Sequence, residues 1–513
     1  MKKVLVFVLF TVFSLVAFVS KPAYAKDELK NSYIYNFWGE AVPSAPGYEL
    51  ERVINVKEYK GLYNAFSSLQ DIFVSDDRIY LVDKSITPDV PSQIIILDHD
   101  FNFIERFYLL KDQDGKIFSY YDQATGQMVQ DRIIGPEGIF VTKDGDLYVA
   151  DTAYRDKSDD SNAIPGARII HFSIAYDRRG NPFYYVKRII RQPENMIGKT
   201  EFLPSKLVVD KADRIYAVVR GGNEGIIELN ADGSFSRYFG VNKMRVNLVD
   251  YFWKRFASDV QKEKMTKVYA PPFNNLDMDA DGFIYATSSD QNTIDFIKRI
   301  NPSGEDVLVR RGYFSPSGDL QGSTTTVFVS VSVNDYGMYA LLDETTGHVF
   351  IYNFDGELLT IIGEKGSTKG SSIQPVDVAW LGDKILVADA KNGRISVYRP
   401  TEFGKLVLDA TKAYYQGEWD LAGNLWLEVI NHNANYDIAY VGYGKMLYMN
   451  EQYKEAKDYF KLGNNRTYYS MAFKKYRNDI LRDNFWLFIT PIVLAAVWVV
   501  YTEYKYNRKG GSN

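Results

Sequence analysis

The feature that most constrains the fold is a short phrase that recurs six times along the chain. The copy at residues 135–151 reads GPEGIFVTKDGDLYVAD, in which two apolar runs flank the turn Lys143-Asp144-Gly145. This pattern predicts a β-hairpin, because glycine adopts the positive φ that a tight turn between antiparallel strands requires. The other copies are DIFVSDDRIYLVD (71–83), KLVVDKADRIYAVV (206–219), NLDMDADGFIYATSS (275–289), VSVNDYGMYALLD (331–343) and DVAWLGDKILVAD (377–389).

Most copies are followed by a second pair of apolar runs, as in EGIIELNADGSFSRYF (224–239) and GHVFIYNFDGELLTII (347–362). Two successive hairpins form a four-stranded antiparallel sheet, which cannot bury both of its faces alone. Several such sheets arranged around an axis bury each face against the next sheet. We therefore expect an all-β six-bladed propeller over residues 48–408, with the strand-like segment 48–56 completing the last blade and closing the ring.

The repeated phrase also resembles a known family. The order P-x-G-hydrophobic, Asp-Gly, then hydrophobic-Tyr-Val-x-Asp is similar to the NHL repeat over about residues 69–408, and the best copy carries Pro136, Gly138, Asp144, Gly145, Tyr148 and Asp151. The third and fourth copies have Val219 and Ser288 in place of the closing Asp. The resemblance implies a β-propeller. It implies no single function, because NHL propellers serve as binding scaffolds and peptide lyases, and related folds as lactonases.

The closing aspartates of the phrase have positions that follow from strand geometry. We expect them to accept backbone hydrogen bonds at the blade turns, which is a structural role, rather than to gather around one cavity. The residues concerned are Asp83, Asp151 and Asp389.

The two ends of the chain indicate export and membrane attachment. Residues 1–25 have a basic start, an apolar run and small residues at Ala23 and Ala25, as in a cleaved secretion signal; an uncleaved anchor is the alternative. A linker follows at 26–47. Residues 485–502 are apolar enough for a transmembrane helix, and basic residues follow it. The positive-inside rule therefore predicts a cell-membrane protein with the tail 503–513 in the cytoplasm and the propeller outside.

The composition narrows the function classes. The chain has no cysteine, which excludes disulfides, thiolate catalysis and cysteine-ligated zinc and suits an exported bacterial protein. Sixty Lys and Arg stand against 65 Asp and Glu, and this net charge of −5 gives no reason to expect nucleic acid as a partner.

From about Glu402 the apolar period changes from two to about 3.6 residues, and we place a helical domain at 409–482. Five small or aromatic residues there recur 34 positions later, and this period resembles the tetratricopeptide repeat (TPR). Two such repeats could dock a protein or could only space the propeller from the membrane. A second helical stretch, at about 242–267, is expected as an insertion between blades that offers a partner surface or covers the propeller.

Catalytic motifs are few. The four histidines form neither HExxH nor an i, i+4 pair, and no GxSxG is present. Asp277, Asp279, Asp281 and Gly282 spell DxDxDG, the opening of a calcium loop, but the twelfth position is Ser288 rather than Glu. Because the stretch coincides with a repeat hairpin, we interpret it as a turn.

A further candidate site emerges when the copies are superposed. The residue just before each inner strand should face one end of the central channel, and most of these positions are polar. Such a ring is suited to bind a sugar or a divalent cation, although channel mouths are also polar simply because they are hydrated. The candidate ligand-binding residues are Asp71, Glu137, Lys206, Asn274, Asn275 and Asp377. A resemblance to lactonase-like propellers, which hold calcium with Glu, Asn and Asp, implies Glu137, Asn274 and Asp377 as metal candidates, while Lys206 brings a positive charge into the ring.

Two functions are open at this point. The first is a non-enzymatic, membrane-anchored extracytoplasmic propeller without a cofactor, which binds a ligand or a protein of the cell envelope; sugar-uptake machinery and carbohydrate are the expected partner and ligand, as proteins resembling this layout occur in Gram-positive bacteria. The alternative is a calcium-dependent extracellular hydrolase of the lactonase or gluconolactonase kind, whose acid and base would flank the metal. Carboxylates close enough together to coordinate one metal ion would favour the enzyme. A wider polar ring that includes Lys206 would favour the binding protein.

Overall fold

The structure is a computed structural model that describes residues 32–59, 62, 66–85, 90–122, 126–152, 166–196, 201–242, 270–290, 295–320 and 325–510. The expected secretion signal and nearly all of the expected helical insertion lie outside these residues. The chain divides into two compact units, residues 1–405 and 406–513, which are described separately below.

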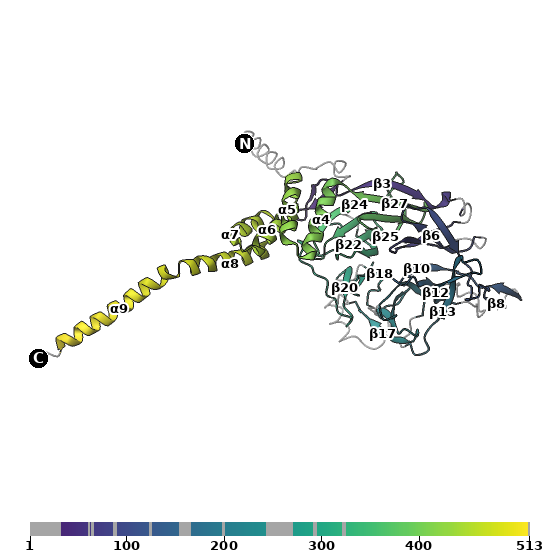
Figure 1. The fold of residues 1–513 in the computed structure, drawn as a ribbon, viewed down its shortest axis with the longest axis horizontal. Helices are drawn as coiled ribbons and strands as arrows, with labels where there is room; N and C mark the ends of the chain where they lie inside the picture. The colour runs from purple at the N-terminus through teal and green to yellow at the C-terminus, as the bar shows by residue number, and fades with distance from the viewer. Residues whose placement is uncertain are drawn as a thin grey trace, which may run out of the picture. The chain divides into compact units, whose positions relative to one another are not determined.

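The first unit is a six-bladed β-propeller (Figure 1). Each hairpin phrase supplies the two inner strands of a blade, as its turn glycine and apolar runs predict. Blade 1 consists of β4 (Leu69–Val74), β5 (Arg78–Asp83), β6 (Gln93–Asp98) and β7 (Phe103–Phe107). Blade 2 consists of β10 (Pro136–Val141), β11 (Leu147–Asp151), β12 (Arg168–Tyr176) and β13 (Pro182–Ile190). Blade 3 consists of β14 (Pro204–Val209), β15 (Ile215–Val219), β16 (Ile226–Leu229) and β17 (Phe235–Phe239).

The remaining blades follow the same order. Blade 4 consists of the three strands β18 (Asn275–Met278), β19 (Ile284–Thr287) and β20 (Ile297–Ile300). Blade 5 consists of β21 (Phe328–Val333), β22 (Tyr339–Asp343), β23 (Val349–Tyr352) and β24 (Leu358–Ile362). Blade 6 consists of β25 (Pro375–Leu381), β26 (Lys384–Asp389), β27 (Arg394–Pro400) and β3 (Tyr48–Asn55). Two short hairpins stand outside the blades, β1 (Tyr33–Tyr35) with β2 (Ala41–Pro43) and β8 (Ser119–Asp122) with β9 (Gln127–Gln130).

The N-terminal strand closes the ring, as the sequence predicts. In Figure 1, β3 lies beside β27, and the two strands pair antiparallel with Val53 opposite Ser396. The innermost strand of each blade contacts that of the next, and β25 of blade 6 contacts β4 of blade 1. The last blade is therefore built from both ends of the propeller sequence.

The core lies between neighbouring blades rather than inside a single one. Ile94 and Ile96 of blade 1 pack in one cluster with Ile139, Ile170 and Phe172 of blade 2, and all five are buried. The alternating apolar residues of each strand thus cover both faces of a sheet by contact with the two adjacent sheets, which is the reason that a single blade would not be stable alone.

The closing aspartates have the structural role that the motif predicts. Asp83 accepts the backbone N–H of Ser68 at 2.8 Å, and Asp151 accepts that of Gly135 at 2.7 Å. Asp389 accepts the N–H of Ile373 at 2.9 Å. Each carboxylate therefore ties the loop that enters a blade to the second strand of the same blade.

The helical part begins earlier than the boundary that we placed at residue 409. Strand β27 ends at Pro400, and α4 runs over Glu402–Gln416, so residues 402–408 are helical. The helices that follow are α5 (Trp419–His432), α6 (Asp437–Met449), α7 (Tyr453–Leu462), α8 (Arg466–Asp483) and α9 (Phe485–Gly510).

Small residues allow the helices of the second unit to approach one another closely. Ala422 and Ala456 are buried, and a Cβ added to Gly444 of α6 would lie 2.8 Å from the Phe460 ring of α7. Neighbouring helices in the sequence contact one another from α5 to α8. Small residues of one helix therefore pack against aromatic side chains of the next.

Helix α9 is long and apolar enough to cross a membrane over Phe485–Arg508. None of its apolar segment is buried within the protein, and Trp486, Leu494 and Trp498 are exposed. A soluble protein would cover such a helix, so this segment supports membrane anchoring at the C-terminal end.

Candidate functional site: the central channel

A channel of about 490 Å³ runs between the six inner strands. Its lining extends from the ring positions Asp71, Lys206 and Asp377 to the exposed hairpin turns that contain Asp76 and Asp144. The end at the ring positions is called the closed end here, and the end at the hairpin turns is called the mouth. A cavity of this volume is in the range that holds a small molecule.

The closed end contains a buried charge cluster. The Lys206 ammonium donates to Asp71 Oδ1 and, at 3.2 Å, to the carbonyl oxygen of Gln70. Asp71 also accepts the backbone N–H of Ile139 at 2.7 Å, and Asp377 accepts that of Ile72 at 2.7 Å. Each carboxylate therefore receives a hydrogen bond from the inner strand of the next blade and joins two blades.

Burial and mutual repulsion set the ionisation of this cluster. Burial raises the pKa of Asp71 well above its usual range and the Asp377 carboxylate acts in the same direction, while Lys206 opposes both. Burial alone would lower the pKa of Lys206, but the two carboxylates outweigh it and raise that pKa. One ammonium thus lies close to two carboxylates and balances their charge.

The missing side chain of Gly138 makes this arrangement sterically allowed. Gly138 holds the ring position of blade 2, between Asp71 of blade 1 and Lys206 of blade 3. A Cβ on Gly138 would collide with the carbonyl oxygen of Ser205 and lie 2.9 Å from Cα of Lys206. The motif glycine therefore lets blade 3 approach closely, and Lys206 reaches past blade 2 to Asp71.

The six ring candidates do not all face the channel. Asp71, Lys206, Asn275 and Asp377 line it, whereas Glu137 and Asn274 are outside its lining. Glu137 and Asn274 each come one residue before the ring position of their blade, and a side chain at that place points away from the channel. Glu137 is bound there by Lys84 and Arg220, and Asn274 donates to the carbonyl oxygen of Phe328 at 2.6 Å.

The three metal candidates do not fit calcium. Glu137 is bound by two cations, Asn274 by Phe328 and Thr287, and Asp377 by Ser330 and the N–H of Ile72. Among the described residues, no three or more His, Asp or Glu side chains are placed to hold a metal ion. Calcium prefers six to eight convergent oxygens, which these three residues do not supply.

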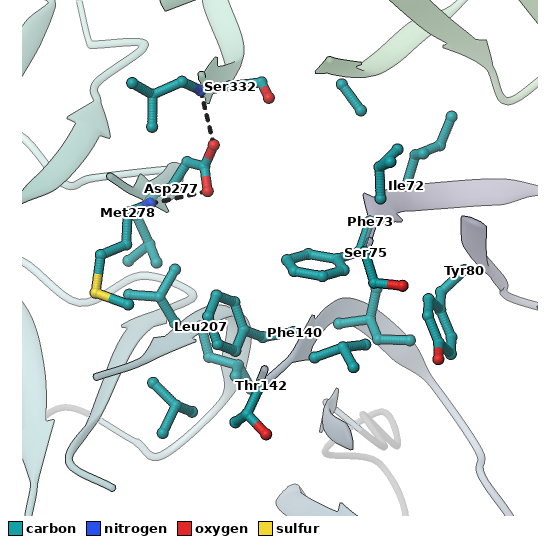
Figure 2. A pocket seen from close by; sticks show the side chains of 18 of the residues that line it. Ile72, Phe73, Ser75, Tyr80, Phe140, Thr142, Leu207, Asp277, Met278 and Ser332 are labelled. Atoms are coloured by element: carbon teal, nitrogen blue, oxygen red, sulfur yellow. Dashed lines mark hydrogen bonds between the residues drawn. The ribbon is translucent and has the colours of Figure 1, made fainter. Parts of the chain in front are cut away.

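The residue that sequence reasoning missed is Asp277. Figure 2 shows its carboxylate in the channel, held by the backbone N–H groups of Met278 and Val333 at 2.8 Å each. The DxDxDG motif predicts only a turn for this stretch, and the turn is present, since Asp279 accepts the N–H of Phe283 at 2.9 Å. Superposing the copies two residues further along the inner strand would have found Asp277, because four of the other five blades have an apolar residue there.

Asp277 is half-buried in apolar surroundings. Burial raises its pKa to about 6, against the two backbone N–H groups, which lower it. In Figure 2, Phe73, Phe140, Leu207 and Met278 surround the same part of the channel. The Phe73 and Phe140 rings meet edge to face with centroids 5.1 Å apart.

The mouth carries mostly negative charge. Ten aspartates and three lysines line the whole channel, and three of the aspartates pair with arginines behind them: Asp77 with Arg78, Asp210 with Arg214 and Asp279 with Arg299. The ten aspartates therefore exceed the three lysines and three arginines by four negative charges. The channel therefore presents an acidic entrance, an apolar interior with one carboxylate, and an ion-paired closed end.

No family model matches the chain, and no curated protein matches it. Its resemblance to the NHL and TPR repeats accordingly stays a prediction. Among solved structures it is similar to a streptogramin B lyase (12% identity, 69% of this chain and 98% of that one, TM-score 0.39), to virginiamycin B lyase from Staphylococcus aureus (11%, 69% and 99%, 0.38) and to a PQQ-bound aldose sugar dehydrogenase from Streptomyces coelicolor (11%, 70% and 99%, 0.36). At this identity the likeness extends to the β-propeller fold and no further.

Proposed function

We propose that the protein is a membrane-anchored, extracytoplasmic propeller that binds a small solute in its central channel and catalyses no reaction on it. The observation that carries this proposal is the channel itself, whose lining extends from exposed turns to the ion pair between Lys206 and Asp71. A cavity of this size, in which apolar side chains surround polar groups, is a usual form of a small-molecule site.

The membrane part of the proposal is supported by α9 and by the basic residues after its apolar segment, Lys505, Arg508 and Lys509. The positive-inside rule then places the propeller outside the cytoplasmic membrane. An anchored solute-binding domain is suited to serve an uptake system of the cell envelope. A protein partner and a sugar as the solute are the expectations that the sequence raised, and the screen below includes sugars.

The lactonase alternative has less support. It needs an acid and a base on either side of a bound metal, and Glu137 and Asp377 are the two carboxylates among the metal candidates. Glu137 is bound by Lys84 and Arg220 outside the channel lining, while Asp377 joins two blades. Glu137 is therefore not among the residues that line the channel, and both oxygens of Asp377, which does line it, already accept hydrogen bonds from Ser330 and Ile72.

A blocked variant tests the proposal. Ser332 lines the channel and is half-buried, so Ser332→Phe should fill part of the cavity. Ser119→Phe, on the exposed strand β8, is the matched control. Purified full-length chain is screened by thermal unfolding against neutral sugars, amines and carboxylates, because a ligand that binds only the native state raises Tm by mass action.

The expected result is that at least one class raises the Tm of the native chain and of Ser119→Phe, but not that of Ser332→Phe. If no class shifts the native Tm, or if the shift survives in Ser332→Phe, the channel is not the binding site.

A further inference from the structure

We infer that the solute is an organic cation, an amine or quaternary ammonium group on an apolar body, whose charge is placed against Asp277. This inference rests on the proposed function and adds the chemical class of the ligand. It comes from the charge of the channel, the surroundings of Asp277 and the apolar walls, each of which is set out below.

The charge of the channel selects against anions. The lining and the arginines behind it have an excess of four negative charges, and the exposed Asp76, Asp144, Asp213 and Asp335 form no ion pair with any described residue. A low-dielectric cleft with charges of one sign raises the local concentration of ions of the opposite sign. The mouth therefore attracts cations and repels carboxylates and phosphates.

Asp277 supplies one negative charge inside the channel. Its partners are the N–H groups of Met278 and Val333 and the side chain of Ser332, and within the described part of the chain it forms no ion pair. The carboxylate at the closed end contrasts with it, because Asp71 is neutralised by Lys206. Burying a carboxylate without a cation is costly. A ligand cation beside Asp277 would therefore gain the electrostatic attraction that no side chain of the protein provides there among the described residues.

The walls around Asp277 determine the rest of the ligand. Phe73, Phe140, Leu207 and Met278 present apolar side chains near the carboxylate, and Ser332 is the nearby polar side chain of blade 5 (Figure 2). A sugar needs several hydrogen-bond partners, and its hydroxyls would lose them against these walls. An apolar body fills the same space favourably, and aromatic faces also attract a cation.

Three probes with one skeleton and three charges test the inference: 2-phenylethylamine, 2-phenylethanol and 3-phenylpropionate. Their affinities are measured by calorimetry at pH 7.5 on the full chain in phosphatidylcholine nanodiscs, with titrations into empty nanodiscs subtracted. The amine should bind at least about tenfold more tightly than the alcohol, because a hydrogen bond to a charged group is worth that much. The carboxylate should bind most weakly.

Asp277→Asn keeps an oxygen that accepts the N–H of Val333 but removes the charge. It should weaken amine binding about 10- to 100-fold and leave 2-phenylethanol binding within about twofold, which shows that the channel is intact. Asp335→Asn makes the same chemical change at the exposed mouth and should alter amine affinity less than about twofold.

The outcomes separate the two proposals. If the alcohol or the carboxylate binds as well as the amine, or if Asp277→Asn binds the amine like the native chain, the cation inference is overturned while the channel remains a binding site. If none of the three probes binds and the thermal screen also shows no ligand, both proposals are overturned.

Discussion

The two halves of the central channel use the same side chain, aspartate, in opposite ways. At the closed end, Asp71 and Asp377 accept backbone N–H groups of the next blade and share the charge of Lys206. In the open half, Asp277 accepts backbone N–H groups as well but has no cation beside it among the described residues. All three carboxylates join neighbouring blades through backbone N–H groups, and the comparison teaches that the absence of a cation is what makes Asp277 the better candidate for a ligand contact.

Removing the balancing charge should have the largest effect. Lys206→Met leaves Asp71 and Asp377 buried beside each other without a cation, so we expect the free energy of unfolding at pH 7 to fall by about 3 to 5 kcal/mol. Denaturant unfolding of the full chain measures it. Adding Asp71→Asn to Lys206→Met should restore part of the loss; a single variant within about 1 kcal/mol of the native chain would show that the pair contributes little.

The open half should respond in the opposite direction. A carboxylate whose pKa is about 6 when folded, above its unfolded value, binds its proton more tightly in the folded state. Folding stability therefore falls as the pH rises from about 4 to about 6 and stays lower above that. Asp277→Asn should stabilise the protein by about 1 to 3 kcal/mol at pH 8.

The gain from Asp277→Asn should vanish below about pH 4, where the native carboxyl is protonated in both the folded and the unfolded state. Asp335→Asn is the control, because this exposed residue should change stability little at either pH. A loss of stability at pH 8 in Asp277→Asn would mean that its bonds to Met278 and Val333 outweigh the burial of its charge.

The smallest effect concerns Glu137, which lies outside the channel. Its partners Lys84 and Arg220 are 30% and 53% exposed, so Glu137→Ala should lower stability by only about 1 kcal/mol. Millimolar calcium should leave the Tm of the native chain and of this variant unchanged. A calcium-dependent rise that disappears in Glu137→Ala would instead revive the lactonase alternative.

The blade pattern was predictable from the sequence because it depends on local chemistry. Turn glycines such as Gly145, with φ of 85°, and alternating apolar residues specify each hairpin. The six hairpin phrases indicate six blades, and the one strand left over, at residue 48, indicates how the ring closes. The site was only partly predictable. Superposition brought Asp71, Lys206 and Asp377 together, but a shift of one residue turns a side chain to another direction, as Glu137 shows.

The importance of Asp277 could not be derived from its motif. The DxDxDG motif specifies hydrogen bonds within one turn, and Asp279 forms these bonds. The role of Asp277 depends instead on a strand of the next blade, since Val333, whose N–H it accepts, lies 56 positions further along the chain. Long-range neighbours of this kind follow from the arrangement of the blades and not from spacing within one repeat.

The pairing of β3 with β27 has a consequence for how the protein is made. Val53 and Ser396 are 343 positions apart (396 minus 53), so at about 5 to 20 residues per second the first strand leaves the ribosome roughly 20 to 70 s before its partner. During that time blade 6 does not exist and β3 has no partner strand. A chain whose translation stops before β27 cannot close its ring and keeps open strand edges, which proteases and chaperones recognise. The terminal strand thereby makes ring closure a test that synthesis has reached the end of β27.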